Sequence, residues 1–388
     1  MTTASRAWVK RNLGFDPIAT PAPSASFATE LAAGTKAQPE DFAREIIDFD
    51  SEGPEGAAFF TFSTSTGLSR FTEIPWPKGL APKTDAKARK GTSGALPKAD
   101  ALVVTWTVDE GHALSRVLTP GKDSRNDYVP YKHNFARIAK KMRKGCPATE
   151  LGRLGTYWTG KIGTKTVVYF KSDSHLSQDT KVAPKTGETL PNEDVWQQII
   201  AEVQPSIILT TGTAGGIGPD CEVGDVVVSP IVDFDCQKWL SKEPFANQSF
   251  KSAAPATRLF NTATKLFKAN SERLPPENKR APKIIRATNK SKAVLTTDFF
   301  GFDTSDNHYG LQGLGSVSEM GDAVLGLVRS RSASKTPVWL AVRNVSDPQI
   351  KAEGTLKDQA KVAAQIYKGF GRWSSVCSAI VCWALIAA

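Results

Sequence analysis

Apolar residues follow two different periods along the chain from Ala99 onward. Ala101 to Trp106 has the length and β-rich composition of a buried strand, whereas Asn192 to Val203 carries apolar residues at helical spacing. Further strands are expected over Tyr157 to Phe170 (two strands joined at Lys161-Ile162-Gly163), Ile207 to Leu209, Val226 to Val228, Ala293 to Thr297 and Pro337 to Val345. Further helices are expected over Ala113 to Leu118, Thr257 to Ala269, Glu319 to Arg329 and from Gln359 to Trp373. Strands that alternate with helices predict an α/β fold with a mainly parallel sheet and ligand-binding loops at the strand ends.

The first hundred residues have a different composition. Pro21 to Ser26 is typical of a linker, and Pro75 to Pro97 is rich in Pro, Lys, Gly and Ala, a composition that buries little surface and predicts loop. Between them, Asp41 to Phe49 suits a short helix and Ala57 to Ser63 a strand. We therefore expect a partly irregular N-terminal extension over residues 1–98 and one catalytic domain over residues 99–388.

Size and charge set limits on the function. The chain has 388 residues, of which 40% are hydrophobic, so it can bury a large core. Its formal charge of +10 favours an anionic ligand such as a phosphate ester, or weak association with nucleic acid. The strongest basic run, Lys122 to Lys144, includes Tyr128, Tyr131 and Phe135. A helix with a solvated basic face explains this run more simply, so a nucleic-acid partner is not expected.

Cysteine and histidine usage, together with hydropathy, indicates a cytoplasmic protein. The five cysteines have no CxxC or metal-ligand spacing, which is typical of reduced thiols. The four histidines lie far apart, so no metal site is expected. The first twenty-five residues lack the apolar core of a secretory leader. Ser374 to Ala388 is apolar but too short to span a membrane, and it is interpreted as the buried end of the last helix.

A glycine-rich segment stands where the strand from Ile207 ends. It reads Thr210-Thr211-Gly212-Thr213-Ala214-Gly215-Gly216 and is followed by Val223-Gly224-Asp225. Because glycine has no side chain, a ligand can approach such a backbone closely. By itself, this pattern indicates a ligand-binding loop after a strand.

Two later segments make the pattern more specific. They are Ser318-Glu319-Met320 and Arg343-Asn344-Val345-Ser346-Asp347. In this order and spacing, the three segments resemble the purine and uridine phosphorylase superfamily, most of all its hydrolytic branch, the methylthioadenosine/S-adenosylhomocysteine nucleosidases. The resemblance runs from Ala99 to the C-terminus. It implies a nucleoside phosphorylase-like fold, a nucleoside or nucleotide substrate, no metal or organic cofactor, and a homo-oligomer, expected to be a dimer.

Cleavage of an N-glycosidic bond needs a proton for the departing base and a nucleophile on the opposite face of the sugar. Asp347 follows an apolar strand, where burial raises the pKa of a carboxyl group towards that of a useful acid. The resemblance makes Asp347 the residue that protonates the purine at N7 and Ser346 the residue that orients it. The alternative is that Ser346-Asp347-Pro348 forms an ordinary turn or helix cap.

Three further residues match those that hold the attacking water in the nucleosidases. Glu110, with Leu114 four residues later, stands where the family has its water-polarising glutamate, although Asp109 fits if the register shifts by one. Thr213 and Arg343 would hold the same water. The alternatives are that Glu110 only favours a helix N-terminus, and that Arg343 forms a structural ion pair with Glu110 or Glu319.

The residue at position 210 separates hydrolysis from phosphorolysis. The hexameric purine phosphorylases have an arginine two positions before the first glycine of this loop, and here Thr210 takes its place. Without that bidentate donor, phosphate is poorly held, so water is the expected nucleophile. Phosphate-dependent cleavage is the first rival.

The remaining expected ligand contacts also follow from the resemblance. It places Ala214 and Gly215 against the substrate, Asp298 and Phe300 at the base (Phe299 if the register shifts) and Met320 under the ribose. One departure stands out, because the family reads Glu-Met-Glu where this chain has Glu319-Met320-Gly321-Asp322. Gly321 cannot accept hydrogen bonds from the ribose hydroxyls, which leaves Glu319 and Asp322 as candidates. A nucleoside-binding or storage protein without turnover is therefore the second rival.

Overall fold

The computed structural model describes residues 74–143, 146–176, 181–183, 187–238, 240–254, 256–268, 274–332 and 337–388. The predicted linker Pro21 to Ser26, helix Asp41 to Phe49 and strand Ala57 to Ser63 lie outside these residues.

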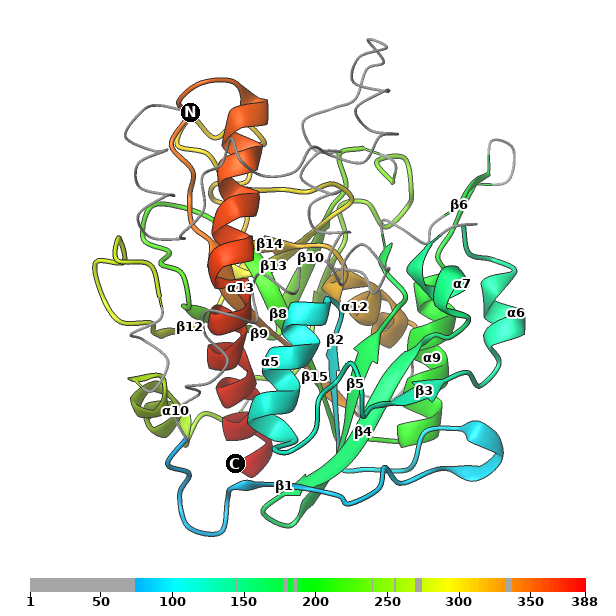
Figure 1. Ribbon diagram of the computed structural model, residues 1–388. Helices are drawn as coiled ribbons and strands as arrows, with labels where there is room; N and C mark the ends of the chain where they lie inside the picture. Colours follow the sequence, from blue (N-terminus) through cyan, green and yellow to red (C-terminus); the bar gives the residue numbers. More distant parts are fainter. Residues whose placement is uncertain are drawn as a thin grey trace.

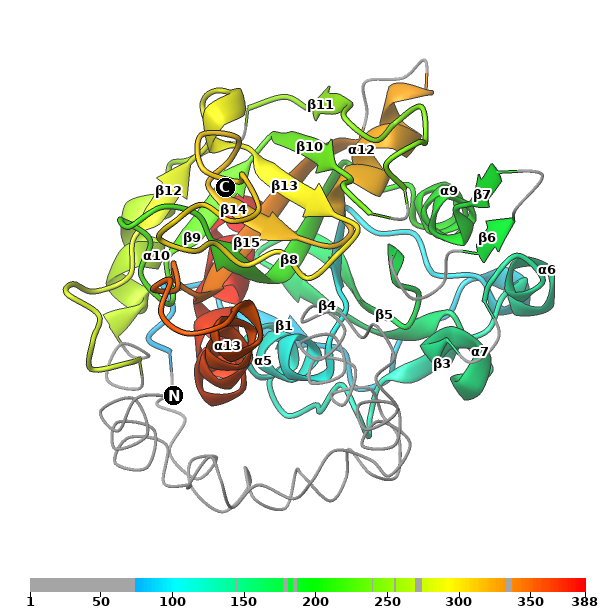
Figure 2. The same ribbon diagram turned by 90° about the horizontal axis from the view of Figure 1, so that it is seen from above.

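A large mixed sheet forms the centre of the molecule (Figures 1 and 2). Its strands run in the order β1-β4-β5-β2-β8-β14-β13-β10-β11, with β3 on β4, β15 on β8 and β9, and β12 on β9. Their bounds are β1 Pro82–Thr84, β2 Ala101–Thr105, β3 Val129–Tyr131, β4 Gly155–Ile162, β5 Lys165–Ser172, β8 Ile207–Gly216, β9 Val226–Ser229, β10 Ile231–Asp235, β11 Ser249–Lys251, β12 Ile284–Arg286, β13 Val294–Thr297, β14 Val317–Glu319 and β15 Val338–Asp347. The central strands β5, β2, β8 and β15 are parallel, which confirms the predicted α/β class.

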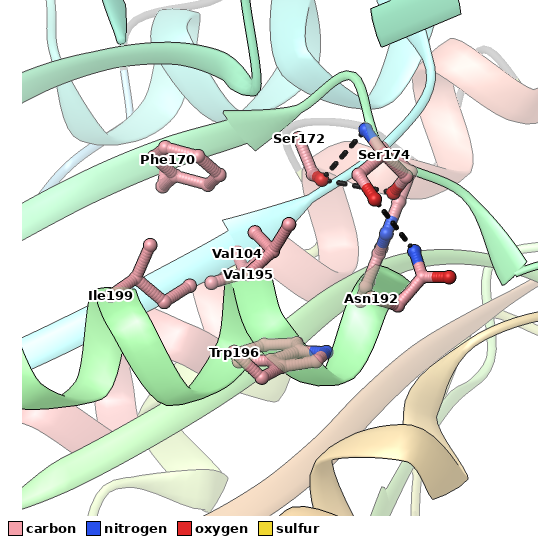
Figure 3. Close-up of a pocket in the computed structure, with 9 residues that line it drawn as sticks. Val104, Phe170, Ser172, Ser174, Asn192, Val195, Trp196 and Ile199 are labelled. Carbon is pink, nitrogen blue, oxygen red and sulfur yellow. Dashed lines mark hydrogen bonds between the residues drawn. The ribbon is translucent and has the colours of Figure 1, made fainter. Parts of the chain in front are cut away.

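Helices cover both faces of this sheet. On one face α5 (Val108–Leu118) packs against α13 (Leu356–Ala387), and on the other α9 (Pro191–Val203) packs against α12 (Asp322–Ser330) (Figure 1). Between α9 and the strands β2 and β5 lies a small cavity (Figure 3). The shorter elements are α6 (Phe135–Ala139), α7 (Pro147–Leu151), α10 (Phe260–Leu266), the 3-10 turns Thr92–Gly94 and Lys290–Lys292, and the hairpin β6 (Lys181–Ala183) and β7 (Gly187–Thr189).

Burial on both faces explains why β2 is a continuous apolar run. Leu102 and Val104 belong to the hydrophobic cluster under α9, whereas Ala101 and Val103 belong to the cluster under α5 and α13. Successive side chains of a strand point to opposite faces, so a strand covered on both sides needs apolar residues at every position.

Several predicted elements differ from those observed. Glu319 ends β14, and the helix after it begins only at Asp322. The expected helix over Thr257 to Ala269 shortens to α10, and the closing helix runs from Leu356 to Ala387. Residues 122–143 form no single basic helix but a loop, β3 and the short α6; residue 144 is outside the described part.

The segment Pro75 to Pro97 is more ordered than its composition predicts. It contains β1, which pairs antiparallel with β4. Just before β1, the ring of Trp76 lies 4.8 Å from that of Trp383 in α13. Residues 74–98 therefore contact the α/β domain, and the proposed boundary at residue 98 stays a prediction.

The C-terminal part of α13 contains the segment that was expected to be too short to span a membrane. Gly369–Ala387 is long and apolar enough to cross a membrane by length and composition, so the statement that this end of the chain is too short is corrected. Yet 89% of its apolar window is buried inside the structure, as expected for the end of a core helix.

Candidate functional site

The candidate residues gather at the carboxyl ends of β2, β8 and β15. The glycine-rich segment does not leave the sheet as a loop, because β8 continues as a strand through Gly216. At Gly212, where φ is +148°, a Cβ atom would lie 2.4 Å from Cδ of Glu110. Only glycine allows this contact, so the glutamate at the start of α5 packs directly on the backbone of β8.

Glu110 is the most densely hydrogen-bonded side chain of the site. Its carboxylate accepts five hydrogen bonds: Oε1 from the backbone N–H and hydroxyl of Thr213, both at 2.7 Å, and Oε2 from the Thr105 hydroxyl and the N–H groups of Trp106 and Thr107 at 2.9–3.0 Å. Burial alone would raise the pKa of Glu110, but Arg343 and the hydrogen bonds from Thr213 and Thr107 bring it below its usual value. Glu110 is therefore a buried carboxylate that fixes the position of Thr213.

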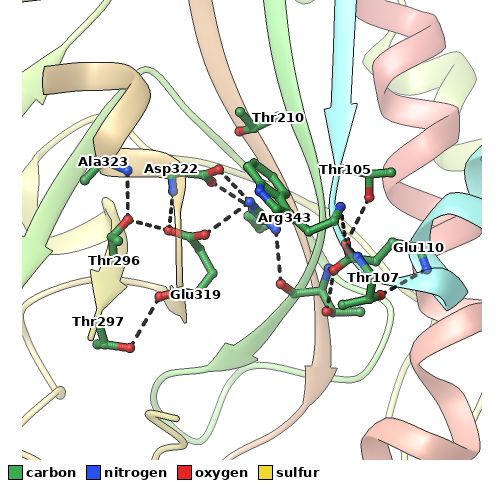
Figure 4. A network of polar contacts seen from close by, with 12 residues as sticks. Thr105, Thr107, Glu110, Thr210, Thr296, Thr297, Glu319, Asp322, Ala323 and Arg343 are labelled. Atoms are coloured by element: carbon green, nitrogen blue, oxygen red, sulfur yellow. Dashed lines mark hydrogen bonds and ion pairs between the residues drawn. The ribbon is translucent and has the colours of Figure 1, made fainter. Parts of the chain in front are cut away.

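Arg343 joins an ion-pair network beside Glu110 (Figure 4). Its guanidinium donates to both carboxylate oxygens of Asp322, at 2.8 and 2.5 Å, and lies 3.1 Å from Oε2 of Glu319. Its outer face lies 4.7 Å from the ring centre of Trp106. Arg343 is thus paired with Asp322 and Glu319. Of the two ion pairs expected from the sequence, with Glu110 or with Glu319, the one with Glu319 is observed.

This network accounts for both acidic residues after β14. Glu319 also accepts hydrogen bonds from Thr296 and from the backbone N–H of Asp322 at 2.9 Å. Burial and the adjacent Asp322 raise the pKa of Glu319 to about 8, although Arg343 opposes the shift. Both carboxyl groups have protein partners, and their expected contacts with the ribose in place of the side chain missing at Gly321 stay predictions.

Asp347 has the environment of a general acid. It ends β15 after an irregularity in the pairing with β8, is 3% exposed, and receives a 2.8 Å hydrogen bond from Ser346 Oγ. Burial raises the pKa of Asp347 to about 6, against the lowering effect of Ser346. Its Oδ2 lies 3.0 Å from the position that a Cβ at Gly215 would occupy, and Ser346 Oγ also lies 3.3 Å from the carbonyl oxygen of Ala214.

Asp347 in β15 and Glu110 in α5 both contact the same strand, β8. Glu110 is held by Thr213, and Asp347 contacts Gly215, two residues further along β8. At a strand rise of about 3.3 Å per residue, these two contacts are roughly 7 Å apart. The two carboxyl groups therefore face neighbouring parts of one site rather than opposite sides of the molecule.

Two of the residues expected at the base have structural roles. The carboxylate of Asp298 accepts hydrogen bonds from the backbone N–H groups of residues 237, 238 and 240 at 2.7–3.2 Å. It thus holds that loop and is itself 1% exposed, and its expected contact with the base stays a prediction. Phe299 packs in the core with Tyr309 at 5.1 Å. Phe300 is half-buried, with its ring centre 5.9 Å from that of Phe302.

Trp106 is a site residue that sequence reasoning missed. Its Cζ2 lies 3.6 Å from the Cβ position of Gly321, and the half-buried Met320 comes just before that glycine. The indole thus packs beside Gly321, at a distance of ordinary van der Waals contact. The available signal was an aromatic residue at the carboxyl end of a buried strand, immediately before the Thr107 that starts α5.

Residues 129–370 match the family model of the Phosphorylase superfamily, a span that covers more than half of the chain. The chain belongs to the Phosphorylase superfamily. This membership confirms the superfamily expected from the three segments. A comparison of the sequence with curated proteins found no match.

Solved structures that resemble this chain include two nucleosidases and a hydrolase. The 5′-methylthioadenosine/S-adenosylhomocysteine nucleosidase from Neisseria meningitidis in complex with methylthio-immucillin-A is 16% identical, with 74% of this chain and 99% of that chain covered and a TM-score of 0.43. Futalosine hydrolase of Helicobacter pylori is 13% identical (74% and 97% covered, TM-score 0.43), and S-adenosylhomocysteine nucleosidase from Streptococcus pyogenes is 14% identical (76% and 98% covered, TM-score 0.43).

The part that matches the Phosphorylase superfamily contains β8, β14 and β15 but begins after Glu110. The assignment of Glu110 therefore rests on its contacts with Thr213.

Thr210 lies within β8, is 1% exposed, and places no charge at the position where the hexameric phosphorylases of this superfamily have arginine. Over the described parts of the chain, no group of three or more His, Cys, Asp or Glu side chains could hold a metal ion.

Proposed function

We propose that this member of the Phosphorylase superfamily hydrolyses the N-glycosidic bond of a purine nucleoside and releases the free base and the sugar. The observation that carries the proposal is the pair of buried carboxyl groups along β8. Asp347 has a pKa raised to about 6 and Glu110 one lowered below its usual value. Two carboxyl groups whose environments separate their pKa values are typical of an acid and a base that act together.

Asp347 is the proposed acid. Its protonated carboxyl donates a proton to the purine ring as the bond to C1′ breaks, and the electron pair of that bond leaves with the base. The Ser346 hydrogen bond on Oδ1, at 2.8 Å, fixes the carboxyl so that Oδ2, which lies beside Gly215, carries the proton. The sugar becomes oxocarbenium-like and needs a nucleophile on its opposite face.

Thr213 is the proposed contact for the attacking water. Its hydroxyl donates to Glu110 at 2.7 Å, which leaves the oxygen lone pairs free to accept a hydrogen bond from water. As water adds to C1′, its proton passes to the Thr213 hydroxyl while that hydroxyl passes its own proton to Glu110. Arg343 does not touch the water in this scheme, because Asp322 and Glu319 hold it; it keeps Glu110 ionised.

The charges around the site support water over phosphate. Arg343 is bound to two carboxyl groups and is 3% exposed, and position 210 carries a threonine. A dianionic nucleophile needs an available cation, and a guanidinium already paired in this way supplies less of one.

The deciding experiment is release of free base from a purine nucleoside panel in phosphate-free buffer and in buffer with phosphate. We expect equal rates in both, with free sugar as the second product. Strict dependence on phosphate, with sugar 1-phosphate formed, would establish phosphorolysis instead. Nucleoside binding without release of base under either condition would establish a binding protein.

A further inference from the structure

The middle of α13 contacts the first turn of α5, the turn that contains Glu110, and the two helices lie side by side (Figures 1 and 2). The Arg372 guanidinium donates from Nε and Nη2 to Oδ1 of Asp109, at 3.0 and 2.9 Å. The Tyr367 hydroxyl donates to Oγ1 of Thr107 at 3.2 Å. α13 therefore holds both the residue that caps α5 and the residue just before Glu110.

The same turn of α13 lies beside the partner of Glu110 in β8. A Cβ atom at Gly371 would lie 3.7 Å from Cγ2 of Thr213 and 3.2 Å from the ring of Tyr367. The backbone N–H and the hydroxyl of Thr213 both donate to Glu110 at 2.7 Å. Since Gly371 and Arg372 are adjacent, one turn of this helix packs on Thr213 and also binds the neighbour of Glu110.

The ion pair between the two helices is buried. Arg372 and Asp109 are each 9% exposed. A buried ion pair contributes little net stability, because the loss of hydration offsets the attraction. It is directional, however, since the planar guanidinium fixes the orientation of the carboxylate that it binds. Further along, the two helices share an apolar cluster that needs no ion pair to pack, so the pair has its main effect on the geometry of the first turn of α5.

We propose that Arg372 and Tyr367 are positioning residues, which hold the first turn of α5 so that Glu110 keeps its contact with the Thr213 hydroxyl. This inference rests on the proposed function, in which that hydroxyl receives the proton of the attacking water and passes its own to Glu110. A proton moves between two oxygens only within hydrogen-bond distance, here 2.7 Å. A small displacement of α5 therefore slows the reaction without removing any group that contacts the substrate.

The test measures kcat and KM of Arg372→Met well below its melting temperature. We expect kcat to fall about tenfold or more with little change in KM, since a misplacement of about 1 Å can cost up to about 100-fold in rate. Arg372→Lys, which can still donate to Asp109, should recover part of the loss. Tyr367→Phe, which removes only the hydroxyl, should lose less. The alkaline fall of kcat should keep its midpoint in all three variants, because Asp347 is untouched.

A double variant keeps the test decisive if Arg372→Met folds poorly. Arg372→Met leaves a buried carboxylate without this cation, whereas Arg372→Met with Asp109→Leu replaces the whole pair by apolar side chains and should fold normally. The double variant should nevertheless keep the low kcat, because the directional contact is gone.

Arg153→Met is the matched control. It removes another arginine from a buried carboxylate, that of Asp173, which Arg153 Nε approaches to 2.7 Å just after β5. It should lower the melting temperature and leave kcat unchanged. A kcat near that of the wild type in the double variant, or an equal fall of kcat in Arg153→Met, would overturn the inference.

Hydrogen exchange separates this inference from the proposed function. The Thr213 amide donates to Glu110, so its exchange reports that contact whether or not a nucleoside is cleaved. If the wild type cleaves no nucleoside, the proposed function fails, and the exchange of residues 210–216 still tests the role of α13. Faster exchange in the double variant than in the wild type and Arg153→Met supports that role, and equal exchange in all three refutes it.

Discussion

At the scale of single residues, two buried carboxyl groups of this site differ in their electrostatic environment. Glu110 and Asp347 are equally buried, at 3% exposure each, yet their pKa values move in opposite directions. Among the described residues, Glu110 has five hydrogen-bond donors and a nearby guanidinium, whereas Asp347 has only the Ser346 hydroxyl. Donors stabilise the charged form, and burial without them favours the neutral form.

Asp347→Asn should reduce kcat for base release by at least about 100-fold, because it removes the proton that the leaving base needs. The amide has the same shape, so nucleoside affinity should change little. Ser346→Ala, which removes only the orienting hydrogen bond, should cost less. A rate within tenfold of the wild type in Asp347→Asn would exclude this residue as the acid.

The pH dependence of the wild-type enzyme should follow the same group. Since the pKa of Asp347 is raised to about 6, the acid form is lost above that value, and kcat should fall about tenfold per pH unit in the alkaline direction. Stability should show the same titration. Relative to Asp347→Asn, the folded protein binds one more proton between about pH 4 and 6, so its unfolding free energy decreases as the pH rises through this window.

Chemical denaturation of both proteins at pH 4 and pH 7 measures this difference, expected to change by about 3 kcal/mol from a shift of about two pKa units. A constant difference across these pH values would mean that Asp347 is already ionised at pH 4.

At the scale of elements, the start of α5 joins helix capping to the site. Thr107 and Glu110 form a capping box, in which each side chain accepts from the backbone of the other. The same Glu110 carboxylate reaches across to Thr213 in β8. The first turn of α5 thereby fixes this part of β8, and the position of the Thr213 hydroxyl, the proposed contact for water, depends on the cap.

Two substitutions separate the cap from the chemistry. Thr107→Ala should cost about 1 kcal/mol of stability, the usual value of an N-cap, with activity within a few-fold of the wild type. Glu110→Gln should cost more, about 3 kcal/mol, because its NH₂ cannot accept from Thr213 and Arg343 loses a nearby charge. It should also reduce kcat by about 100-fold or more. Thermal unfolding and base release measure both effects, and equal losses of activity in the two variants would assign Glu110 a purely structural role.

At the scale of the whole molecule, α13 connects the sheet, α5 and the segment before β2. Trp383 is fully buried, packs against Trp76 with the two rings tilted by 46°, and donates to the carbonyl oxygen of Leu80 at 2.6 Å. Residues 74–98 are thus packed on the domain that they precede. The homodimeric state and the cytoplasmic location expected from the sequence stay predictions.

Truncation tests where the domain begins. A chain that starts at Ile74 should keep its melting temperature and activity, because it retains Trp76 and β1. A chain that starts at Ala99 should melt at a lower temperature, since it exposes Trp383 and the edge of β4. Circular dichroism on heating compares the two, and equal melting temperatures would support the boundary at residue 98.

The amino-acid sequence alone determined the α/β class, the glycine-rich end of a strand and the superfamily, and it singled out Asp347 and Ser346, whose burial and hydrogen bond the structure then described. These features are local: a period of apolar residues, a run of glycines or a short motif can be recognised without knowing which residues it contacts in the folded protein. The tertiary structure decided which partners each charge meets. Arg343 pairs with Asp322, Asp298 anchors a loop, and Trp106 packs beside Gly321. Each of these contacts joins residues that lie far apart in the chain, and such contacts leave no periodic pattern in it.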